Sequence, residues 1–105
     1  MTPVVVLTTV GANFDPSEIA TQLVEKRLAA CVNIIPQVHS VYRWKDKIQK
    51  DTEQLLLIKT VESQIDDLRD ALFSMHPYEV PEVLAFAVEE GSAAYLEWLR
   101  ASTRG

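Results

Sequence analysis

The middle of the chain holds the feature that most constrains its fold, a pair of long strand-like segments. Cys31 to Trp44 looks like one strand, and Ile48 to Thr60 looks like its antiparallel partner. The residues that join them, Lys45-Asp46, are few enough for a hairpin, although they lack the glycine that a primed turn prefers. Pro36 indicates a bend or an unpaired edge position in the first segment. We therefore expect one long hairpin.

A strand and a helix flank this hairpin on each side. Residues 3–9 form a nearly continuous β-branched run, which favours a strand buried on both faces. Asp15-Pro16-Ser17-Glu18 is typical of a helix start, and the apolar stripe that follows predicts an end near Ala29. After the hairpin, the pattern predicts a second helix at residues 63–75 and a fourth strand at residues 83–88.

The order of elements is therefore β-α-β-β-α-β, with a further short helix after Gly91-Ser92. Right-handed crossovers in this order give the α+β class and the split βαβ, or ferredoxin-like, sandwich, with both helices on one face of a four-stranded sheet. The other face must bury apolar residues of the hairpin, and long hairpin strands offer unpaired edges. We expect a single domain over residues 1–105 that associates with copies of itself.

Charge and cysteine content exclude several classes of protein. The net charge is −5, and acidic residues interrupt the densest basic run, at residues 45–50, so we expect no nucleic-acid partner. The apolar run at residues 4–7 is far too short for a signal peptide or a membrane span, so we expect no membrane partner. Cys31 is the only cysteine, which suits a reducing compartment, and we expect a cytoplasmic location.

Motifs that mark common enzymes are absent from the sequence. Its three glycines form no phosphate-binding loop, there is no CxxC or HExxH motif, and no serine lies in a nucleophile elbow. We therefore expect no enzyme and no organic cofactor. An acylphosphatase-like activity on the same topology is the weakest alternative, because the turn at residues 11–13 lacks the arginine that such chemistry needs.

The most function-like segment runs from His76 to Glu82 and holds a histidine, a tyrosine and two glutamates between two stiffening prolines. His76 follows the second predicted helix, where it is either a capping residue or a metal ligand. Cys31 is either a small buried side chain or a soft ligand for Cu(I) or Zn(II). Tyr42 and Trp44 share one strand face, as packing residues or as a ligand-stacking wall. Lys59 should pair with an acid such as Glu53 or Glu82.

Five segments together resemble the CutA family of divalent-cation tolerance proteins. In order they are Leu28-Ala29-Ala30-Cys31-Val32-Asn33, Ser40-Val41-Tyr42-Arg43-Trp44, Glu53 with Ile58-Lys59-Thr60, His76-Pro77-Tyr78-Glu79-Val80-Pro81-Glu82, and Tyr95-Leu96-Glu97-Trp98-Leu99. The resemblance implies a ferredoxin-like homotrimer, like the PII signalling proteins, and a link to tolerance of copper and other divalent cations. Some bacterial members are credited with a copper site of one first-strand cysteine and two histidines. Here Thr8 and Met75 stand at two of those positions, and His76 remains.

Two functions follow as hypotheses. The first is a homotrimeric protein that binds copper or another divalent cation weakly, with His76, Cys31 and Glu79 as the candidate ligands. The alternative is a PII-like signalling or small-ligand module that binds a small organic anion in clefts between subunits. The residues expected to line such a cleft are Tyr42, Trp44, Glu53, Lys59, Tyr78 and Glu82.

Overall fold

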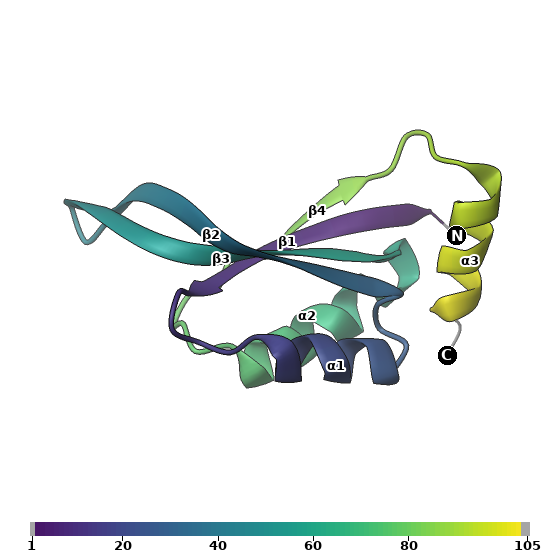
Figure 1. The fold of residues 1–105 in the computed structure, drawn as a ribbon, viewed down its shortest axis with the longest axis horizontal. Coiled ribbons are helices and arrows are strands. Elements are labelled where there is room, and N and C mark those ends of the chain that lie inside the picture. The colour runs from purple at the N-terminus through teal and green to yellow at the C-terminus, as the bar shows by residue number, and fades with distance from the viewer. Residues whose placement is uncertain (1, 104–105) are drawn as a thin grey trace.

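The computed structural model describes residues 2–103, which form one antiparallel sheet and three α-helices (Figure 1). The elements are β1 (Pro3–Gly11), α1 (Ser17–Glu25), β2 (Cys31–Trp44), β3 (Lys47–Val61), the short 3-10 helix η1 (Glu62–Gln64), α2 (Ile65–Met75), β4 (Leu84–Ala87) and α3 (Ala93–Ser102). The strand order is β2-β3-β1-β4, with α1 and α2 together on one face of the sheet. The predicted ferredoxin-like α+β sandwich with an extra C-terminal helix is confirmed.

The first helix is shorter than the sequence predicts. It ends at Glu25 and not near Ala29, because Arg27 adopts a left-handed conformation with φ of 59°. The backbone N–H of Arg27 then donates to the carbonyl of Val24, and that of Leu28 donates to the carbonyl of Leu23. This is the hydrogen-bond pattern of a Schellman C-cap, with arginine where glycine is more common. Leu28 continues the apolar stripe but packs against the core from the loop.

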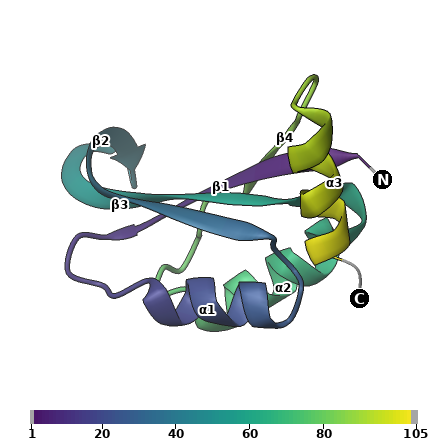
Figure 2. The ribbon, with the colours of Figure 1, turned by 45° about the vertical axis from the view of Figure 1, so that its right-hand side comes forward.

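The hairpin forms as predicted, with a tight turn made without glycine. Lys45 and Asp46 both have positive φ, 50° and 63°, as a type I′ turn requires. The register between β2 and β3 shifts between Ile35 and Val38, where Pro36 lies, which confirms the predicted irregularity. Beyond this shift the hairpin extends past α1 and α2 and coils away from the rest of the sheet (Figures 1 and 2).

The hydrophobic core lies between the helices and one face of the sheet. The alternate residues of β1 that face the helices are buried, and the residues between them are only half-buried. The β-branched run predicted that β1 would be buried on both faces. Within one chain only the face toward the helices is buried. The fully or nearly fully buried side chains that meet these β1 residues are Ile19 and Leu23 of α1, Leu56 and Ile58 of β3, and Leu68 and Leu72 of α2.

The second face of the sheet is largely open. Leu7 pairs with both Leu57 and Leu84, and Val5 pairs with Phe86, so these residues share that face. Leu84 and Phe86 are 51% and 53% exposed. The helix α3 packs at one end of the sheet, where Leu99 is buried, and leaves the remainder of this face uncovered (Figure 2).

Candidate functional site

The end of α2 determines where His76 lies. The residue before a proline is disfavoured in the α conformation, and His76 is accordingly extended, with φ of −74° and ψ of 137°. Its backbone N–H still donates to the carbonyl of Leu72, at 2.8 Å, which completes the last turn of the helix. The side chain extends toward β1, where its ring contacts Thr8 and Thr9.

Both ring nitrogens of His76 have hydrogen-bond partners. Nε2 lies 2.8 Å from the carbonyl oxygen of Thr9 and 3.3 Å from the hydroxyl of Thr8. The backbone N–H of Tyr78 donates to Nδ1 at 3.1 Å. This pattern assigns the ring proton to Nε2, which donates to Thr9, and leaves Nδ1 as the acceptor. Burial lowers the pKa of His76 below its usual 6.5, against the opposing effects of the Thr9 bond and the charge of Glu53, so the ring is neutral at pH 7.

Tyr78 links this loop to β3. Its phenol donates to Oε2 of Glu53 at 2.5 Å, and its ring packs 4.9 Å from the ring of His76. Glu53 is only 7% exposed, although it is an acidic residue. Burial, followed by the hydrogen bond and the charge of Glu53, raises the pKa of Tyr78 well above its usual 10. The phenol therefore stays protonated and remains a donor.

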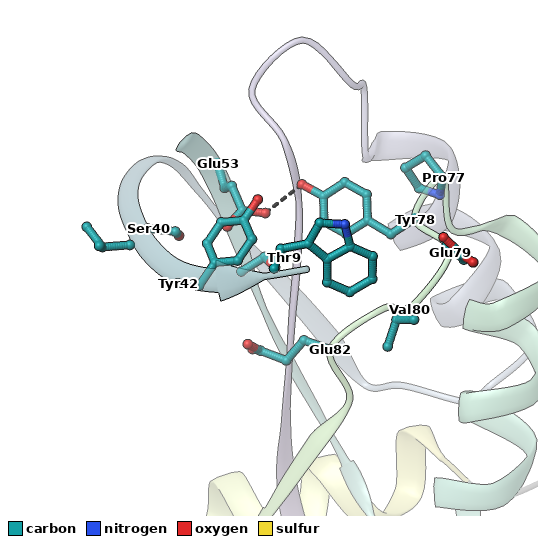
Figure 3. A pocket seen from close by; sticks show the side chains of 11 residues that line it. Thr9, Ser40, Tyr42, Glu53, Pro77, Tyr78, Glu79, Val80 and Glu82 are labelled. Carbon is teal, nitrogen blue, oxygen red and sulfur yellow. Dashed lines mark hydrogen bonds between the residues drawn. The ribbon is translucent and has the colours of Figure 1, made fainter. Parts of the chain in front are cut away.

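A cleft of about 730 Å³ opens between the hairpin and this loop (Figure 3). This volume lies within the range of small-molecule binding sites. The hairpin contributes two aromatic rings and Glu53, and the phenol of Tyr42 donates to Asp51 across the two strands. The lining residues are Thr9, Ser40, Val41, Tyr42, Trp44, Glu53, Pro77, Tyr78, Glu79, Val80 and Glu82.

The structure brings most of the predicted cleft residues together. Tyr42, Trp44, Glu53, Tyr78 and Glu82 all line this cleft. Lys59 does not, because it lies farther along β3, opposite Cys31, with its ammonium 5.7 Å from the ring of Tyr95. Within residues 2–103 neither Glu53 nor Glu82 forms an ion pair with Lys59. The cleft lining therefore holds carboxylates without a basic side chain, and its charge does not favour the organic anion that the alternative hypothesis expects.

The predicted metal ligands are not assembled into one group. Glu79 lines the cleft and His76 adjoins it, but Cys31 is the first residue of β2, where its thiol lies 3.7 Å from the amide oxygen of Asn33. Met75 packs against the core, so its thioether is not directed into the cleft. In the described part of the chain, no three histidine, cysteine or acidic side chains are close enough to hold a metal ion.

Sequence reasoning missed four parts of the site. Thr9 acts through its main-chain carbonyl, which leaves no signal in the sequence. Asp51 meets Tyr42, and Ser40 and Val41 line the cleft, only because of the register of the hairpin beyond Pro36. In this register Asp51 is paired with Ser40, two pairs from Tyr42 on the same strand face, which is the diagonal position that a long side chain can reach.

A family model described as "CutA1 divalent ion tolerance protein" matches residues 4–102. The chain belongs to this family. It is 56% identical to protein CutA of Homo sapiens over 86 residues, which are 82% of this chain and 48% of that protein. It is 46% identical to the chloroplastic protein CutA of Arabidopsis thaliana over 101 residues, 96% of this chain and 56% of that protein. The chain thus spans about half the length of these two relatives.

A solved CutA1 structure shows the same fold. The divalent cation tolerance protein of Thermus thermophilus superposes with a TM-score of 0.92 at 45% identity, covering 97% of this chain and 99% of that one. The family description and the name of the Thermus protein refer to tolerance of divalent cations, and neither names a catalysed reaction. Among residues 2–103 of this CutA1 chain, no helix is long and apolar enough to cross a membrane.

Proposed function

We propose that this CutA1 chain acts in divalent-cation tolerance as a homotrimer that binds divalent ions weakly beside His76. The observation that supports it best is the neutral imidazole of His76 at the edge of a cleft lined by Glu53, Glu79 and Glu82. Neutral imidazole is the form that ligates metal ions, and imidazole with carboxylate suits Zn(II) and Cu(II).

The hydrogen bonds of His76 explain why such binding should be weak. A metal ion at Nδ1 must displace the backbone N–H of Tyr78, which costs about 0.5–1.5 kcal/mol, or roughly a twofold to tenfold loss of affinity. Nε2 is the less available nitrogen, because its proton is donated to Thr9. The carboxylates must also move toward the ion, since no three ligands are assembled within residues 2–103.

Isothermal titration of the full chain with Zn(II) and Cu(II) tests the role of His76. His76→Gln keeps a donor for Thr9 but removes the Nδ1 lone pair, so we expect it to lose most of the binding. His39→Ala is the matched control, because His39 is the other histidine and lies exposed on β2. Equal binding by wild type and His76→Gln would remove His76 from the site.

Self-association is supported by the open face of the sheet. Leu84, Phe86 and the α3 residues Tyr95 and Trp98 are each between 42% and 53% exposed, and an exposed apolar surface of this kind is typical of association sites. Light scattering after size exclusion should give about three times the chain mass of 11.8 kDa. A monomer at micromolar concentration would contradict this part of the proposal.

A cytoplasmic location belongs to the same proposal. It is supported by the single cysteine, Cys31, which suits a reducing compartment. The chloroplastic name of the Arabidopsis relative identifies the plastid as the competing compartment. Imaging of the full-length protein in its own cell distinguishes the two.

A further inference from the structure

Glu53 is a nearly buried carboxylate with no cationic partner in the described part of the chain. It is 7% exposed, and within residues 2–103 no lysine, arginine or histidine forms an ion pair with it. Tyr78 donates to Oε2, whereas Oε1 accepts no hydrogen bond from the described residues and is not fully buried, so it can accept one from a ligand. Burying an ionised carboxylate is costly unless a counter-charge compensates for the lost hydration. Because Glu53 lines the cleft, a cation bound in the cleft can supply that charge.

The walls of the cleft determine which kind of cation fits. Tyr42, Trp44 and Tyr78 line it and keep 41%, 40% and 36% of their surface exposed. The faces of aromatic rings attract organic cations, and Trp44 already has the ammonium of Lys45 at 5.8 Å from its ring centroid. Figure 3 shows the Glu53 carboxylate joined to the phenol of Tyr78 by a hydrogen bond, with the ring of Tyr42 overlapping the carboxylate in this view.

We propose that this cleft binds a small organic ammonium ion. An N–H of the ammonium donates to Oε1 of Glu53, while the alkyl part lies against the rings of Tyr42, Trp44 and Tyr78. Glu79 and Glu82 also line the cleft and add to its attraction for a cation. The aromatic rings around Glu53 suit the alkyl part of an organic cation, whereas a bare divalent ion gains nothing from contact with them. The inference therefore goes beyond cation tolerance and does not depend on His76 as a ligand.

The test is isothermal titration of the full, metal-free chain with n-butylammonium chloride, with n-butanol as the neutral ligand of similar shape. We expect saturable binding of butylammonium and none of butanol. Glu53→Gln keeps an acceptor for the Tyr78 phenol but removes the charge, and should weaken binding at least about tenfold. Trp44→Leu should weaken it about twofold to fivefold. Glu90→Gln is the matched control, because it removes an exposed carboxylate outside the cleft lining and should bind like wild type.

Three results would overturn the proposal. Butanol could bind as tightly as butylammonium; this comparison uses the wild-type chain alone, so it does not depend on whether Glu53→Gln folds. Glu53→Gln, shown to be folded by circular dichroism, could bind like wild type. Glu90→Gln could lose as much affinity as Glu53→Gln, in which case only net charge attracts the ligand.

Discussion

Replacing His76 with alanine removes two hydrogen bonds, one that ties its ring to the Thr9 carbonyl of β1 and one in which the ring accepts from the Tyr78 N–H within the loop. Each such bond contributes about 0.5–1.5 kcal/mol, and the lost ring leaves a gap at a half-buried position. We expect His76→Ala to lower the free energy of unfolding by about 2–3 kcal/mol. His39→Ala, on the exposed surface of β2, should change it by no more than about 0.5 kcal/mol.

Two conservative variants separate the two bonds. The side-chain oxygen of asparagine lies where Nδ1 lies, so His76→Asn should keep the bond from the Tyr78 N–H and lose the bond to Thr9. The amide nitrogen of glutamine lies near the position of Nε2, so His76→Gln should do the reverse. Each should recover about half of the loss seen with alanine. Urea unfolding followed by circular dichroism at one fixed protein concentration measures these differences. A loss for His76→Ala no larger than that for His39→Ala would refute the assigned hydrogen bonds.

Three further predictions concern the same region and the hairpin. The pKa of His76 in the folded chain lies below 6.5, so the stability that its neutral ring contributes is complete above pH 6.5 and is lost as the pH falls through the folded pKa. The urea midpoint of wild type should therefore fall more steeply below pH 6.5 than the urea midpoint of His76→Gln. Tyr78→Phe removes the phenol that donates to the nearly buried carboxylate of Glu53, and should lower the free energy of unfolding in urea by about 1.5–3 kcal/mol. The loss should be smaller in a chain that already carries Glu53→Gln, and equal losses in both backgrounds would contradict the hydrogen bond. Asp46→Gly places glycine at a turn position with a positive φ of 63°, and should raise the free energy of unfolding by about 0.5–1 kcal/mol and the thermal midpoint with it. A lower thermal midpoint would contradict the assigned turn.

The fold could be predicted because its signals are local and agree with one another. The β-branched run of β1, the two apolar helix stripes and the long hairpin determine the order of elements, and that order leaves few topologies. The end of α1 could not be predicted, since Leu28 continues the helical period while the backbone at Arg27 has already turned. The spacing of apolar residues shows which side chains are buried, but it does not show the backbone conformation at each of them.

The candidate site could be predicted only for residues whose side-chain type itself indicates a binding role. The tyrosines, Trp44 and the glutamates are recognisable residue types, and the topology does gather them. Lys59 is a residue type that suits such a cleft, but the register places it opposite Cys31 and outside the cleft lining. The roles of His76 depend on a main-chain carbonyl and a main-chain N–H, which no residue pattern reveals.

The central claim about function is that divalent ions bind at Nδ1 of His76. Nitrogen-15 NMR of the two histidine rings during titration of the full chain with Zn(II) tests it most directly. The account predicts a neutral His76 ring protonated at Nε2 before metal is added, and a Zn(II)-dependent shift of its Nδ1 signal that follows the calorimetric binding curve. Unchanged His76 nitrogens while calorimetry records binding would contradict the claim and place the metal elsewhere.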